Sequence, residues 1–242
     1  MLEIKCFSFN AFQECCSVVW NGSGECAIID PGFYTEEEKE ILFSFIREKG
    51  LNPVKILLTH AHFDHVYGVK ACVDEYGVQV MMNPADKVIL ENNEYFCQMF
   101  RLKAPEGGFV TEDVKAGDHI RFGGCAEGTA GGDSDTHGGE TEAWCGDIDF
   151  EVIETPGHTP GGVCYLERKE KVLFSGDTLF AGAIGRTDNQ WGDYDALMKG
   201  IFEGLMTLDG DIKVIPGHGP HTTIADERMK NPFLMPFNEE YD

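Results

Sequence analysis

The sequence predicts an α/β protein in which two β-sheets pack together with helices on their outer sides. The first observation is that short apolar segments of strand length recur along the chain between turns rich in Gly, Pro and Asp. The second is that each half of the chain begins with strands and then alternates strands with helices, which favours two packed layers of sheet. The third is that four of these strands run directly into short turns that carry His or Asp.

The first half of the chain contains a strand meander and three helical segments. The helix expected over 35–49 has the clearest local signals, because Thr35 and Glu38 form a capping box and Gly50 stands just beyond its end. Strands are expected over 2–9, 15–20, 25–30, 54–59 and 78–82, and further helices over 64–76 and 84–103.

The second half repeats this arrangement after an unusual segment. Residues 124–147 contain seven glycines and six acidic residues, a composition that cannot bury much apolar surface, so we expect a flexible surface insertion there. Strands are expected over 149–155, 162–167, 171–176 and 212–215, and helices over 193–207 and 223–230. We expect residues 1–242 to form a single domain that carries this insertion.

Charge and composition exclude some classes of partner. The formal net charge of −23 repels phosphate backbones and anionic membrane surfaces, so we expect neither nucleic acid nor membrane partners. No apolar run approaches the roughly 20 residues of a membrane span, and the N-terminus lacks the apolar core of a signal peptide. Nine cysteines without a C-x-x-C pair indicate reduced thiols in the core or on the surface, so we expect a cytoplasmic protein.

The segment from Val54 to His65, VKILLTHAHFDH, combines a buried strand with a dense group of possible metal ligands. His60 and His62 are two residues apart, so on an extended chain they face the same side and can bind one ion together. If the chain turns after His62, Asp64 and His65 face another side and can serve a second ion. Four such residues at the end of a buried strand are difficult to explain by packing.

Three further strands end in glycine-containing turns that carry His158, Asp177 and His218. Each turn alone is a weak signal, because a Gly-His or Gly-Asp turn is usually only a turn. Together with residues 60–65 they provide seven ligand-type residues. Seven is too many for one tetrahedral zinc and suits two ions.

The motifs THAHFDH, PGHTPG, SGDTLF and PGHG, in this order, resemble those of the metallo-β-lactamase-fold hydrolases. Within them, GDTLF followed by GRTD, and GHGPHTT, are most similar to the glyoxalase II-like branch. The resemblance implies a four-layer αββα sandwich. It also implies a ligand set for two divalent ions: His60, His62 and His158 for the first ion, Asp64, His65 and His218 for the second, and Asp177 as the bridge.

The resemblance implies a metal-dependent hydrolase, most closely a thioesterase that acts on small hydroxyacyl thioesters. Two ions sharing a water lower its pKa towards about 7, which provides a hydroxide nucleophile at neutral pH. Asp64 is the candidate catalytic residue because it can also orient that hydroxide. Zinc is the expected metal, although iron and manganese accept the same imidazole and carboxylate ligands.

Two other activities remain open at this point. A persulfide dioxygenase with one iron is similar in sequence, and a lactonase or β-lactamase would use the same two-ion chemistry. A complete second ligand set, Asp64, His65 and His218, favours the dinuclear hydrolase without excluding the dioxygenase.

Two residues outside the ligand motifs remain ambiguous. Arg186 follows Asp177 in a loop that should overhang the metals, where it either contacts the substrate or pairs with Asp188. His221 lies close to His218 in the sequence, and we interpret it as a structural residue.

Overall fold

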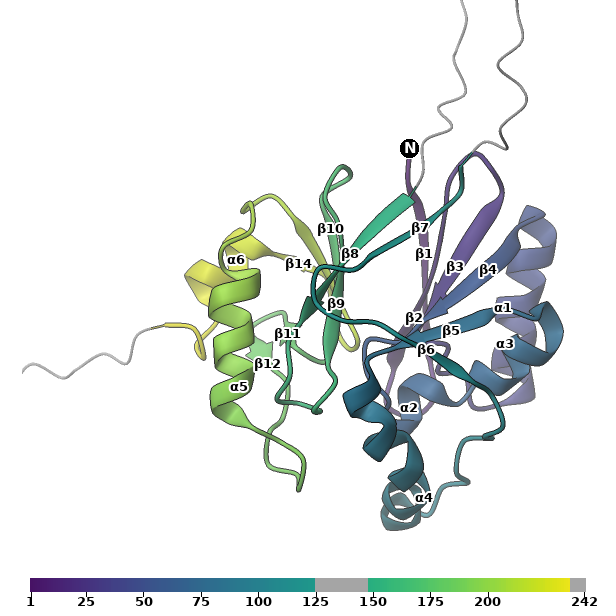
Figure 1. The fold of residues 1–242 in the computed structure, drawn as a ribbon, viewed down its shortest axis with the longest axis horizontal. Helices are drawn as coiled ribbons and strands as arrows, with labels where there is room; N and C mark the ends of the chain where they lie inside the picture. The colour runs from purple at the N-terminus through teal and green to yellow at the C-terminus, as the bar shows by residue number, and fades with distance from the viewer. Residues whose placement is uncertain (125–147, 236–242) are drawn as a thin grey trace, which may run out of the picture.

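Two six-stranded sheets form the centre of the molecule, which we describe from a computed structural model covering residues 1–124 and 148–235 (Figure 1). The first sheet has the order β1-β2-β3-β4-β5-β6, and the second has the order β14-β13-β10-β9-β8-β7. Helices α1 and α3 cover the outer side of the first sheet, and α5 and α6 cover the outer side of the second. This arrangement confirms the predicted αββα sandwich.

The strands of the first sheet all come from the first half of the chain. They are β1 (Glu3–Phe9), β2 (Glu14–Trp20), β3 (Glu25–Ile29), β4 (Asn52–Leu57), β5 (Gln79–Met82) and β6 (Thr111–Asp113). The second sheet contains β7 (His119–Phe122), β8 (Ile148–Glu154), β9 (Val163–Glu167), β10 (Val172–Gly176), β13 (Lys213–Pro216) and β14 (Thr222–Thr223). A small separate hairpin is formed by β11 (Leu179–Phe180) and β12 (Ala183–Ile184).

The helices follow the predicted segments with some internal breaks. They are α1 (Glu36–Lys49), α2 (Phe63–Val66), α3 (Val69–Tyr76), α4 (Lys87–Phe100), α5 (Tyr194–Lys199) and α6 (Ile224–Lys230). A 3₁₀ turn (Pro84–Asp86) precedes α4, and a π-helical segment (Gly200–Leu205) continues α5. No helix among the described residues is long and apolar enough to cross a membrane.

Alternation along the strands creates the three apolar layers between the four structural layers. On β3, Ile28 packs beneath the helices of the first sheet, whereas its neighbour Ile29 faces the second sheet. On β9, Tyr165 faces the first sheet, whereas Leu166 packs beneath the helices of the second. Successive strand residues point to opposite faces. Complete burial of a side chain of this size stabilises the folded state by about 1.5–3 kcal/mol relative to leaving it exposed.

The segment 64–76, predicted as one helix, is divided between α2 and α3 at Gly68. The backbone N–H of Gly68 donates to the carbonyl of Pro31 at 2.7 Å instead of continuing the helix. A Cβ at Gly68 would lie 2.3 Å from the ring of Phe33, so this close packing requires glycine. The break leaves α2 as a single short turn.

The predicted flexible insertion, 124–147, lies outside the described residues except for Gly124. Its flexibility, and with it the single-domain organisation of residues 1–242, stays a prediction.

Candidate metal centre

The seven predicted ligands lie together, beyond the ends of four strands. His60 and His62 follow β4, with Asp64 and His65 just after them on α2; His158 follows β8, Asp177 follows β10, and His218 follows β13. Both sheets therefore contribute to the same site. The prediction that strand ends carry these residues matches their position, while their role as ligands stays a prediction.

In the first three-residue set, the three imidazoles have ring nitrogens close enough together to bind one metal ion. The candidate ligand atoms of His60, His62 and His158 all lie within 4.8 Å of one another. Nδ1 of His62 is 3.0 Å from Nε2 of His158. Three convergent imidazoles of this kind are a ligand set that zinc accepts.

The second set is arranged in the same way beside the first. The candidate ligand atoms of Asp64, His65 and His218 also lie within 4.8 Å of one another. Nε2 of His65 is 3.2 Å from Nε2 of His218, which is in turn 3.4 Å from Oδ2 of Asp64.

Asp177 lies between the two sets and faces both. Its Oδ1 is 3.5 Å from Nε2 of His65, and its Oδ2 is 3.4 Å from Nε2 of His158. Oδ2 is also 3.6 Å from Nε2 of His218. A carboxylate that contacts members of both sets has the position of a bridging ligand.

The hydrogen bonds around the histidines leave unprotonated nitrogens facing one another. Four of these rings use Nδ1 as a donor to an oxygen, which fixes the tautomer and leaves Nε2 with a free lone pair. The pairs are His60 with Thr59 Oγ1 at 3.1 Å, His65 with Asp30 Oδ2 at 3.1 Å, His158 with the Arg186 carbonyl at 2.8 Å, and His218 with the Phe12 carbonyl at 2.9 Å.

Two further observations show that these residues fit bound cations. Nε2 of His60 and Oδ1 of Asp177 are buried and have no hydrogen-bond partner among the described residues. Facing lone pairs repel one another unless a cation lies between them. The donor set of imidazole and carboxylate suits zinc, iron or manganese.

The pKa shifts of the histidines differ between the first and the second ligand set. Burial, together with the neighbouring His158, lowers the pKa of His62 to about 3, which keeps its ring neutral and able to bind a metal. Burial opposes a charge on His65, but Asp177 and Asp64 outweigh it and raise the pKa of His65. The acidic side of the site thus attracts positive charge, from a proton or from a metal ion.

Asp30 supports the loop that carries His60 and was not among the predicted site residues. Its carboxylate accepts bonds from the backbone N–H of Thr59 at 2.7 Å, the hydroxyl of Thr59 at 2.6 Å, and Nδ1 of His65. One signal was available, since an acidic residue directly follows a buried strand. Its partners are 29 and 35 residues away and could not be identified locally.

Asp86 joins two ligand loops and was also missed, because it appeared to be an ordinary helix start. Its buried carboxylate accepts the backbone N–H of Ala61 at 2.8 Å and that of Gly161 at 2.6 Å. The hydroxyl of Thr159 donates to the same carboxylate at 2.9 Å. The loop carrying His60 is thereby fixed to the loop carrying His158.

An open cleft of about 310 Å³ leads to these ligands. The apolar part of its lining consists of aromatic rings and a methionine. These residues are Phe12, Phe63, Phe96, Met99 and Phe100. The polar lining includes Arg186 and Asn189 as well as five of the candidate ligands.

Arg186 lines the cleft but already has a partner. Its guanidinium donates to both carboxylate oxygens of Asp188, at 2.9 and 3.3 Å. Both side chains are more than two thirds exposed. Of the two interpretations left open for Arg186, the structure shows the ion pair; contact with a substrate stays a prediction.

Comparison with known proteins assigns the chain to a family. The family model of the metallo-beta-lactamase superfamily matches residues 10–218. The chain belongs to this superfamily. As a metallo-beta-lactamase-fold protein it is a metal-dependent hydrolase by family, and this fold typically binds two divalent metal ions.

Curated relatives of this superfamily match almost the whole chain. A protein of Haemophilus influenzae named hydroxyacylglutathione hydrolase GloC is 36% identical over 96% of this chain and 98% of its own. The probable metallo-hydrolase YqgX of Bacillus subtilis is 34% identical over 88% and 89%.

Solved structures agree with the superfamily assignment. The BLEG-1 B3 metallo-beta-lactamase is 30% identical, with a TM-score of 0.78, and the match covers 97% of this chain and 100% of that one. TTHA1623 in a di-iron-bound form is 31% identical, with a TM-score of 0.78, over 95% and 100%. ETHE1 from Myxococcus xanthus, at 21% identity and a TM-score of 0.69 over 95% and 83%, shows the shared fold alone.

Proposed function

We propose that this protein is a metal-dependent thioesterase that hydrolyses small hydroxyacyl thioesters. One observation carries the proposal: two groups of three candidate ligands lie on either side of Asp177, beside an open cleft. The similarity to hydroxyacylglutathione hydrolase GloC supports the thioester as the substrate class.

Under this proposal His60, His62 and His158 would hold one divalent ion, and Asp64, His65 and His218 would hold the second, with Asp177 bridging. When bound, the two ions would supply an activated water at neutral pH and a Lewis acid for the substrate carbonyl. Zinc is the metal we propose, and iron and manganese suit the same ligands.

The protein's own groups would position the reactants. Asp64 is about one-tenth exposed and open to the cleft, so one carboxylate oxygen can accept a hydrogen bond from the attacking water while the other faces His218. The aromatic wall of Phe63, Phe96 and Phe100 would hold the apolar part of the substrate and exclude bulk water. A thiol with a pKa near 8.5 leaves readily as thiolate, so no strong general acid is required.

A lactamase activity is the second candidate, because BLEG-1 matches essentially the whole chain. A cyclic amide would place its carbonyl in the same site. Its hydrolysis would expel an amine, which is a poorer leaving group than a thiolate. The persulfide dioxygenase would need one iron and molecular oxygen. These three activities consume different reactants and can be separated on one sample.

The decisive experiment measures metal content, thioester hydrolysis, β-lactam hydrolysis and oxygen uptake on the same preparation. We expect at least two ions per chain and hydrolysis of hydroxyacyl thioesters without oxygen uptake. A single tightly held iron, with no second ion under any loading and with oxygen uptake on a persulfide, would contradict the thioesterase.

We expect slow turnover and a KM near 1 mM on S-lactoylglutathione, at the upper end of the usual range. The cleft offers an anionic thiol carrier only Arg186 as a cation among its described lining residues, and Asp188 already pairs with it. Binding energy from the remote part of the substrate therefore cannot be used to raise the rate. The measurement is a steady-state comparison of one acyl group on glutathione and on smaller, uncharged thiols.

Weak discrimination among these thiols would agree with an apolar cleft. A KM in the low micromolar range for the glutathione ester alone would show that a glutathione pocket exists and that this prediction is wrong.

A further inference from the structure

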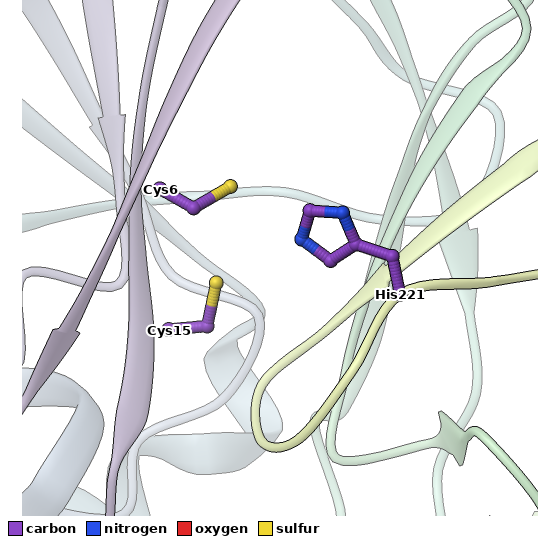
Figure 2. A group of neighbouring side chains, drawn as sticks. All are labelled: Cys6, Cys15 and His221. Carbon is purple, nitrogen blue, oxygen red and sulfur yellow. The ribbon is translucent and has the colours of Figure 1, made fainter.

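A second group of metal-type side chains lies apart from the seven candidate ligands described above. Cys6 on β1, Cys15 on β2 and His221 in the loop before β14 point toward one another across the space between the two sheets (Figure 2). One ligand atom from each lies within 4.8 Å of the other two. Both cysteines are partly buried, and His221 is exposed.

Strand register places the two sulfurs for a bridging ion rather than for a disulfide. Cys6 is directly opposite Ser17, and Cys15 is opposite Ser8, so the two cysteines are diagonal neighbours on one face of the hairpin. Diagonal neighbours are about 7–8 Å apart at the backbone. A disulfide rarely spans more than about 7 Å between Cα atoms, whereas an ion adds the length of two metal–sulfur bonds.

The two neighbouring thiols shift each other's pKa in opposite directions. The hydrogen bond from the Cys15 thiol, with help from Ser17 and His221, lowers the pKa of Cys6 to about 5. The same hydrogen bond, together with burial, raises the pKa of Cys15. The hydroxyl of Ser17 donates to the Cys6 sulfur at 3.4 Å. A bound cation would hold both sulfurs as thiolates, because metal binding displaces the thiol protons.

We propose that Cys6, Cys15 and His221 form a third metal site, which takes a thiophilic divalent ion of the zinc class. Two thiolates and one imidazole are ligands that select such an ion. Tetrahedral bonds of about 2.3 Å place two thiolates about 3.8 Å apart, so the group needs only a small contraction. The thiol protons of Cys6 and Cys15 are released to solvent on binding, and water fills the fourth position beside the exposed His221.

The site would connect the N-terminal hairpin to the loop that carries His218. The backbone N–H of Cys15 already donates to the carbonyl of Gly217 at 2.8 Å. His221 follows His218 by three residues in the same loop. An ion held between this hairpin and His221 would therefore stabilise the position of His218 without touching the substrate.

The test uses Co²⁺ as a spectroscopic probe on the reduced, full-length protein. Cobalt bound by thiolate gives an intense near-ultraviolet charge-transfer band. The seven candidate ligands of the hydrolase centre provide only nitrogen and oxygen, so that centre contributes no such band. We expect the band in the unsubstituted protein and its loss in both Cys6→Ser and Cys15→Ser.

Matched controls distinguish this site from the other thiols. Cys125 and Cys145, which lie outside the described residues, are removed together in C125S/C145S, and the band should persist. His221→Gln changes an exposed side chain and leaves both thiols in place. It should weaken Co²⁺ binding by at least about 10–100-fold, the cost of losing even an indirect partner of a metal.

Three results would overturn the proposal: no charge-transfer band in the loaded, reduced protein, a band that survives in both single serine variants, or unchanged Co²⁺ affinity in His221→Gln. None of these readouts depends on thioester hydrolysis. Failure of the third site is therefore distinguishable from failure of the proposed thioesterase activity.

Discussion

Replacing Asp177 with alanine is expected to lower kcat/KM for thioester hydrolysis by about 1000-fold or more. Asp177 faces members of both ligand sets, at 3.4–3.6 Å from His65, His158 and His218. Its loss removes a carboxylate that faces both ligand sets, and with it several kcal/mol of transition-state stabilisation. Each 1.36 kcal/mol corresponds to a tenfold change in rate.

The matched control is Arg186→Ala in the same cleft. Its ion pair with Asp188 is exposed, so its loss should change activity by less than about tenfold. Rates are compared at saturating metal, and bound metal is measured by elemental analysis. Asp177→Ala should also lose at least one ion. Equal and mild losses of activity in both variants would contradict the bridging assignment.

Replacing Asp86 with alanine is expected to lower the free energy of unfolding by about 3–5 kcal/mol. The carboxylate of Asp86 satisfies the N–H groups of Ala61 and Gly161 and the hydroxyl of Thr159. Each buried donor left without a partner costs about 1–3 kcal/mol. Urea denaturation in the presence of saturating zinc measures the change, which should appear as a lower midpoint.

Asp113→Ala is the matched control for Asp86. Asp113 pairs with Lys87 on the surface, where both side chains are about half exposed, so its loss should cost less than about 1 kcal/mol. Asp86→Asn should fall between the two, because one side-chain oxygen remains to accept a bond. A cost for Asp86→Ala no larger than for Asp113→Ala would show that the two ligand loops are held by other contacts.

Local sequence signals were sufficient to predict the elements whose ends are set by nearby residues. Helix α1 has the predicted capping box of Thr35 and Glu38, and Gly50 adopts the left-handed conformation, with φ of 65°, just beyond it. Strands β2 and β3 match the predicted apolar segments to within one residue at each end, whereas β4 begins and ends two residues before the predicted 54–59. The two-residue strands β11, β12 and β14 were missed because two residues are too few to show any periodicity.

The candidate site was predictable where residue type and spacing carried the information. The motif of residues 60–65 and the three glycine turns identified seven residues that the structure brings together. Asp30 and Asp86 could not be found in this way, because their partners are distant in sequence and become neighbours only after folding. His221 was interpreted as structural, and its nearness to Cys6 and Cys15, more than 200 residues away, could not be read from the local sequence.

The division of strands between the two sheets has a consequence for the order of folding. Among the described residues, strands β1–β6 pair only with one another, as do β7–β14, apart from an isolated bridge between Glu14 and His218. The first sheet can therefore assemble during synthesis while its inner face, including Ile29 and Leu57, still lacks its cover. His218 is the last of the seven candidate ligands to be synthesised and follows a strand of the second sheet. Tight metal binding should therefore follow docking of the two sheets. Hydrogen exchange during refolding would test this, since protection of β3 and β4 should precede metal uptake.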